Sequence, residues 1–142
     1  MVTLVDLLDS LRAAIEAATP SEPVSEDDTF RTFTLGAPVR RSTRAVLVTA
    51  TPPIRLLPGS TCTDWGTTVT LSVIYAIGQA EEGQRTAYER ALLDSETIAA
   101  AIYAWAAQGN ALRVELAEGD ISPDGDGALI CERTATVHWD RG

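Results

Sequence analysis

The chain has 142 residues, of which 45% are hydrophobic and 22% are charged. This length and balance are those of one folded domain with its own core, and they exclude a chain that is disordered throughout. Asp and Glu number 20 against 11 basic residues, all of them arginine, and the net charge of −9 excludes the basic footprint that tight DNA or RNA binding needs. No apolar run is long enough to span a membrane, and the acidic N-terminal segment does not resemble a signal peptide. Cys62 and Cys131 are widely spaced and are expected to be reduced thiols.

An amphipathic helix is predicted over residues 2–19 and is expected to end before Pro20. Its apolar residues recur at spacings of four, three, four and three, which places them on one face that packs on the core. These residues are Leu4, Leu8, Leu11, Ile15 and Ala18.

Strands are predicted within residues 29–77, at Thr29–Leu35, Arg44–Thr51 and Thr67–Ile77. The last of these has the clearest two-residue alternation, with one apolar face turned to the core. Its second face is polar up to Ile74, and we expect the apolar end to be covered by another element.

Two segments between these strands are candidate contact surfaces. Arg40, Arg41 and Arg44 form the densest basic cluster, which fits either contacts to an acidic neighbouring subunit or salt bridges within the chain. The segment 52–66 reads as a long loop with exposed apolar side chains, a pattern typical of a binding surface. The alternative is a short strand at 54–57 with a tryptophan covering the edge of the core. The residues concerned are Ile54, Arg55, Leu56, Leu57 and Trp65.

A long central helix is predicted over residues 84–108, followed by a C-terminal β-hairpin over 111–140. Asp94 and Ser95 could cap a new helix start and break the helix there. Gly109 is expected to stop it in a left-handed conformation. Together these elements predict an α+β domain. A mainly antiparallel sheet of four to five strands packs against the N-terminal helix and the central helix.

No residue pattern marks a catalytic, cofactor or metal site. The stretch Asp120–Gly127 resembles a calcium loop, but its twelfth position is Cys131 instead of Glu and its flanks read as strands, so a hairpin turn is the better interpretation. His138 is the only histidine, and the cysteines lack the spacing of a zinc site. Nucleotide-binding and hydrolase motifs are also missing, so the chain is not expected to be an enzyme.

The order of these elements resembles that of the tail-terminator, or tail-completion, proteins of long-tailed bacteriophages. The resemblance runs through most of the chain and rests on diffuse signals. These are the strand TTVTLSVIYAIG, the helix YERALLDSETIAAAIYAW and the hairpin RVELAEGDISPDGDGALICERTATVHW.

The resemblance implies a virion protein, made in the host cytoplasm, that forms a homo-oligomeric ring, usually a hexamer. Such a ring caps the tail tube and joins it to the head, with DNA passing through its lumen. The implied partners are other copies of the chain, the tail-tube protein and a head-completion or neck protein, with no cofactor, no sequence-specific nucleic acid and no membrane. Two alternatives stay open: another neck or injection-apparatus adaptor, and a small-molecule-binding domain.

Overall fold

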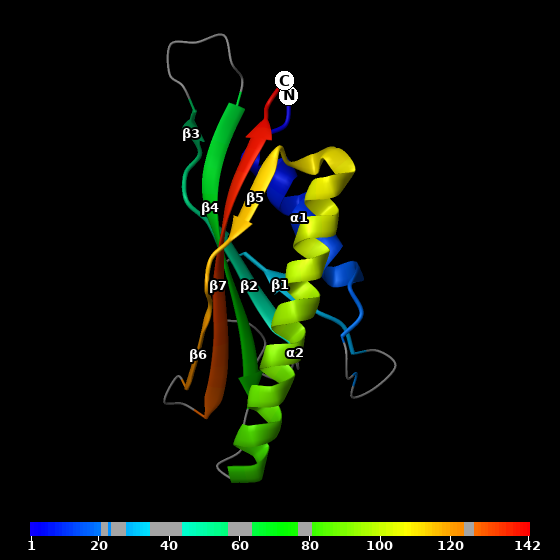
Figure 1. The fold of residues 1–142 in the computed structure, drawn as a ribbon, viewed down its shortest axis with the longest axis vertical. Coiled ribbons are helices and arrows are strands. Elements are labelled where there is room, and N and C mark those ends of the chain that lie inside the picture. The colour runs from blue at the N-terminus through cyan, green and yellow to red at the C-terminus, as the bar shows by residue number, and fades with distance from the viewer. Residues whose placement is uncertain (21–22, 24–27, 35–43, 57–63, 77–80, 124–126) are drawn as a thin grey trace.

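The computed structural model describes residues 1–20, 23, 28–34, 44–56, 64–76, 81–123 and 127–142. Two helices pack on one side of a mainly antiparallel sheet, which confirms the predicted α+β class (Figure 1). The helices are α1 (Leu4–Ala17) and α2 (Glu81–Trp105), the latter followed by a π-helical turn, η1 (Ala106–Asn110). The strands are β1 (Arg31–Phe33), β2 (Ala45–Ala50), β3 (Ile54–Arg55), β4 (Asp64–Ala76), β5 (Arg113–Leu116), β6 (Asp120–Pro123) and β7 (Ala128–Asp140).

The centre of the sheet is a long antiparallel pair, β4 with β7, in register from Asp64 opposite Asp140 to Ala76 opposite Ala128. On one side of this pair, β2 and then β3 run along β4, and β1 adds to β2 in parallel. On the other side, β5 and then β6 run along β7. The sheet therefore has two outer edges, one made by β1 and β3 and the other by β5 and β6.

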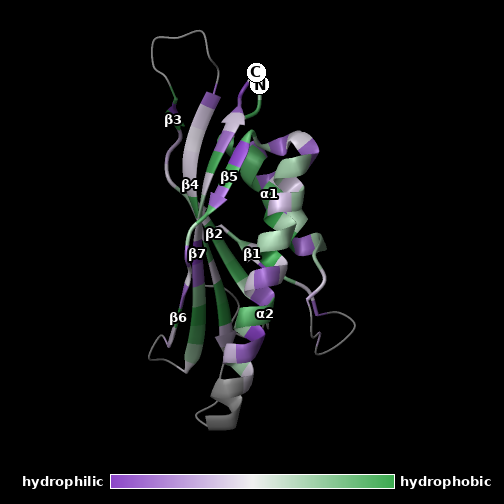
Figure 2. Ribbon diagram, in the orientation of Figure 1, coloured by the Kyte–Doolittle hydropathy of each residue, from purple (hydrophilic) through white to green (hydrophobic). Residues whose placement is uncertain are grey.

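The core lies between the sheet and the helices. Alternate residues of β4 and β7 face the helices and are buried, as the two-residue period predicts. Figure 2 shows green, hydrophobic colouring on β2 and on the lower parts of β4 and β7, whereas hydrophilic and hydrophobic residues alternate along β5. The buried hydrophobic residues on this face of the sheet are Val46, Val48, Val69, Leu71, Val73, Tyr75, Leu129, Cys131, Ala135, Val137 and Trp139.

Helix α1 begins with a capping box. The Thr3 hydroxyl accepts a hydrogen bond from the Asp6 backbone N–H, and the Asp6 carboxylate accepts one from the Thr3 N–H at 3.0 Å. These bonds from the Thr3 backbone and side chain lower the pKa of Asp6. The buried stripe of the helix contains Leu7, Leu11 and Ile15. Leu7 was missing from the predicted stripe because the four-three count started from Leu4 and Leu8, which are only partly buried.

Helix α2 continues without interruption through Asp94, so the predicted break is wrong. Its buried stripe contains Ala91, Ile98, Ile102 and Trp105, which recur at helical spacing. Asp94 is not a cap because its carboxylate is buried on the same face and bonds to other elements. Gly109 has φ 91°, which confirms the left-handed stop.

The C-terminal region contains a third strand where a loop was predicted. Residues 120–123 form β6, which pairs with Glu132 to Leu129 of β7. Gly119 separates β5 from β6 and lies against β7, since a Cβ atom there would be 2.6 Å from the Glu132 carbonyl oxygen. The first four positions of the calcium-like stretch are therefore strand residues, while residues 124–126 lie outside the described residues.

Candidate functional site: the two edges of the sheet

The segment expected to be an exposed loop begins with a strand instead. Ile54 and Arg55 form β3 and pair with Gly66 and Trp65 of β4. Trp65 is partly buried against the core, with the Arg141 guanidinium 4.4 Å from its ring centroid. The alternative of a short strand with a tryptophan at the core edge is thus confirmed for Ile54 and Arg55, the first half of the predicted strand.

Part of this segment is exposed, as was expected of a contact surface. Ile54 is 64% exposed, Arg55 is exposed, and Leu56 is partly buried with its N–H donating to the Asp64 carbonyl at 2.9 Å. Leu57 lies outside the described residues. Contact between this segment and another subunit stays a prediction.

Arg44, expected to contact a neighbouring subunit, is buried within its own chain. Its side chain is 0% exposed, and its backbone has φ 72°, which is uncommon for a residue other than glycine. The guanidinium forms a buried ion pair with Asp28, and its Nε atom donates to Asp94 at 2.9 Å. The prediction that Arg44 touches a neighbouring subunit is therefore wrong, and the alternative of a salt bridge within the chain is confirmed. Arg40 and Arg41 lie outside the described residues.

The Arg44 cluster, which we define as Asp28, Arg44, Tyr75 and Asp94, joins four segments under the sheet. The Tyr75 hydroxyl donates to the Asp94 carboxylate at 2.5 Å. Burial of the phenol, together with this bond to a carboxylate, raises the pKa of Tyr75 far above its ordinary value. Because these bonds link α2, β4 and the residue before β2, we assign the cluster to holding these elements together.

The β1 edge of the sheet is closed by side chains from α1. Because the Arg31 N–H donates to Arg44, the next residue, Thr32, points its backbone groups away from β2. The Thr32 N–H donates to Glu16 at 3.1 Å, and the Thr32 carbonyl accepts from Arg12 at 3.4 Å. Pairing the exposed backbone of an edge strand in this way prevents another strand from adding there.

The opposite edge, β5 and β6, is open. Within the described residues these strands pair only with β7. Arg113 and Glu115 form an exposed ion pair, which leaves the acids Glu118 and Asp120 on the edge. Asp120 lies directly opposite Glu132 of β7, and both are exposed. Like charges in directly opposite positions of a sheet are destabilising.

An apolar stripe of α2 accompanies this open edge. Tyr88, Leu92 and Tyr103 are 46%, 45% and 49% exposed and share one helical face with Ser95. The Ser95 hydroxyl accepts a hydrogen bond from Arg133 of β7 at 3.2 Å, so this face is turned towards the β7 side of the sheet. Large exposed apolar residues in one row are typical of a contact surface.

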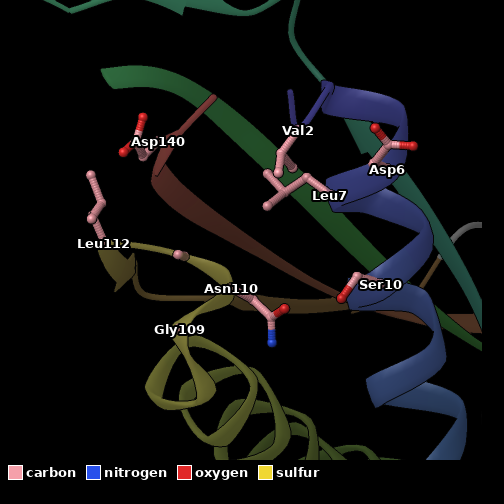
Figure 3. A pocket seen from close by; sticks show the side chains of 9 residues that line it. Val2, Asp6, Leu7, Ser10, Gly109, Asn110, Leu112 and Asp140 are labelled. Atoms are coloured by element: carbon pink, nitrogen blue, oxygen red, sulfur yellow. The ribbon is translucent and has the colours of Figure 1, made fainter. Parts of the chain in front are cut away.

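Two hollows of the described surface have the shape of possible ligand sites. The first is a pocket of about 160 Å³ between the start of α1 and η1, where Figure 3 shows Asp6, Ser10, Asn110 and Asp140 around it. This volume is below the roughly 300 Å³ at which ligand pockets begin. The second is an open depression of about 500 Å³ between α1 and α2, lined mainly by alanines and by no charged side chain.

The described residues contain no group of three or more acids, histidines or cysteines able to hold a metal ion. Cys131 is a buried free thiol whose pKa is raised by burial, so it is a poor nucleophile at neutral pH. Within the same residues no helix is long and apolar enough to cross a membrane. The two edges of the sheet are therefore the candidate functional surfaces of the described residues.

The main features missed at the sequence level are the Arg44 cluster and β6. An acid at position 94 on the apolar stripe of a helix was the available signal for the first, because a buried charge requires a partner. The alternating residues Ile121 and Pro123, on the core side of β6, were the signal for the second, but the Gly and Asp residues around them favoured a turn. Neither the protein-family models nor the curated proteins compared with the chain give a match, so the fold and its two edges carry the functional argument.

Proposed function

We propose that the chain is a structural subunit of a phage tail, similar to a tail terminator, which forms a ring at the end of the tail tube. The observation that carries this proposal is the layout of the sheet. Both helices pack on one face, one edge is closed by α1, and the other edge is open and acidic beside an exposed apolar stripe. A row of large exposed apolar side chains beside an open edge is typical of a surface that contacts another protein.

The uncovered face of the sheet fits a conduit for DNA. It carries rows of hydroxyl side chains, with Thr49 opposite Thr70, Thr70 opposite Thr134, and Thr68 opposite Thr136. Neutral hydroxyls and acids do not bind phosphates strongly, so DNA would slide past such a surface. In this proposal the partners are further copies of the chain, the tail-tube protein and a head-completion or neck protein.

The first experiment is light scattering of the purified chain over a wide concentration range, with negative-stain images of the largest species. We expect a mass near six times 15.1 kDa and a ring whose hole admits duplex DNA. Tail-tube protein is then added, and capped tubes are expected.

Other outcomes decide between the candidates. A ring that binds the head-completion protein but never the tube supports a neck adaptor. A chain that stays monomeric at every concentration, with and without tube protein, contradicts the proposal.

A further inference from the structure

We infer that the side of the molecule between α2 and the β5–β6 edge is a docking site for an amphipathic helix of a different protein, one that carries basic residues beside its apolar face. The inference names the partner of the surface that supports the proposed function, and it rests on that function in taking the chain to work by binding other proteins. We call this surface the open flank. It consists of Tyr88, Leu92 and Tyr103 of α2 with Val114, Leu116 and Ile121 of β5 and β6.

The open flank exists because β5 and β6 are only partly covered by the helices. Their three apolar residues lie directly opposite buried core residues of β7, so these side chains are on the helix side of the sheet. Unlike their partners on β7, they are only partly buried. A helix is about 10 Å across and neighbouring strands are about 4.8 Å apart, so one further helix beside α2 would cover both strands.

Helix α2 forms the other wall of the open flank. Leu92 and Tyr103 are about half exposed and share a helical face with Ser95, which accepts a hydrogen bond from Arg133. The Arg133 side chain also lies against Gly119, between β5 and β6. The apolar stripe of α2 and the apolar residues of β5 and β6 therefore border the same side of the molecule.

The edge itself is poorly suited to accept an added strand. Leu116 pairs with Ala135 of β7. Asp120 pairs with Glu132 of β7. The edge thus advances four residues while β7 advances three, and this extra residue is a β-bulge that interrupts the row of outward backbone groups. Pro123, further along the edge, has no N–H to donate. A helix that packs through its side chains fits the open flank better than a strand.

The charges around the open flank favour a basic partner. Glu89 and Glu96 are exposed and lie three residues before and four residues after Leu92, so they border the stripe of α2. Glu118 is exposed on the strand side. Arg133, which reaches the flank from β7, is bonded to α2 and has a buried Nε atom. Lysines or arginines beside the apolar face of a docked helix would meet the three glutamates.

The same charges disfavour a second copy of the chain as the occupant. The chain has a net charge of −9, and two copies docked flank to flank would bring the three glutamates against one another. Two nearby arginines do not change this balance. Arg90 lies seven residues before Thr97, on the face of α2 turned towards α1. Arg113 precedes Val114, so it points to the other face of the sheet, where it is paired with Glu115.

The test uses three synthetic peptides of about 18 residues, which is about five helical turns. The first has leucines at helical spacing and lysines elsewhere, the second has the same composition in scrambled order, and the third has glutamate in place of lysine. We expect the first to bind with a Kd of about 10 μM at physiological salt, and the other two at least about tenfold more weakly. Fluorescence anisotropy measures binding. NMR spectra of the 15N-labelled chain should place the largest shift changes at Leu92, Tyr103 and Leu116.

Two variants and one matched control locate the contact. Leu92→Ala with Tyr103→Ala removes apolar surface, and Glu89→Lys with Glu96→Lys reverses charge, so each should weaken binding of the first peptide about tenfold. Asp120→Lys with Glu132→Lys makes the same change in charge at exposed positions on the other face of the sheet and should weaken binding by less than about threefold. Circular dichroism checks that each chain is folded.

Three results would overturn the inference: no binding of the first peptide, equal binding of the scrambled one, or parent-like binding by both flank variants. Loss of self-association by Leu92→Ala with Tyr103→Ala, measured by sedimentation velocity, also overturns it, because the occupant is then a second copy. None of these results removes the ring proposal. That proposal fails if the parent chain stays monomeric alone and with tube protein, and binding of the first peptide by such a monomer leaves the docking site standing.

Discussion

The polar and charged groups at the two edges of the sheet differ in whether they are paired within the subunit. At the β1 edge the polar groups are paired inside the subunit: Thr32 bonds to Glu16 and Arg12, and Arg44 is buried between two aspartates. At the β5–β6 edge the acids Glu118 and Asp120 remain exposed, and the strands pair on one side only within the described residues. The first arrangement stabilises the subunit, whereas the second leaves acidic side chains exposed at the edge.

The strongest test of the closed side is Arg44→Met. This change leaves Asp28 and Asp94 buried without their cation, so we expect the free energy of unfolding to fall by about 3–5 kcal/mol. Urea unfolding followed by circular dichroism measures it. Arg113→Met, which removes an exposed pair with Glu115, is the matched control and should cost at most about 1 kcal/mol. Equal losses in the two variants would mean that the Arg44 cluster does not stabilise the fold.

A smaller effect is expected from opening the β1 edge. Glu16→Ala removes the acceptor of the buried Thr32 N–H and should lower the free energy of unfolding by about 1 kcal/mol. Glu89→Ala, at an exposed position of α2, should change it little. The same urea titration compares them, and identical midpoints would show that the edge does not depend on Glu16.

The smallest effect is expected at the open edge, and with the opposite sign. Asp120→Asn relieves the repulsion with Glu132, so the isolated subunit should become more stable by less than about 0.5 kcal/mol. The gain should shrink as salt is added, because exposed charges are screened. A loss of stability in low-salt urea titrations would mean that Asp120 already has a stabilising partner within its own subunit.

Residue periodicity was enough to predict the helices, the long β4 strand and the buried face of β7. Val69, Leu71 and Val73 alternate strictly, and Ile98, Ile102 and Trp105 follow a helical stripe, so local sequence determines which side is buried. Periodicity could not predict contacts between residues that are far apart in sequence. Nothing near Arg44 indicates that it bonds to a residue 50 positions away, so the sequence left open whether its partner lies within the chain or in a neighbouring subunit.

The open edge was missed for a related reason. The residues of β5 and β6 read as a hairpin arm and a turn, and only the strand order places them at the rim of the sheet, opposite β1 and β3. The charge pattern along each edge is visible in the sequence. Which charges share an edge depends on tertiary pairing.

The Arg44 cluster should also affect the rate at which the folded chain unfolds. Its members come from before β1, just before β2, the end of β4 and the middle of α2, so it can assemble only after most of the chain has collapsed. Contacts that form after the transition state mainly reduce the rate of unfolding. We therefore expect the cluster to lengthen the lifetime of the native state more than it speeds folding, a property suited to a protein that must persist in an assembled particle.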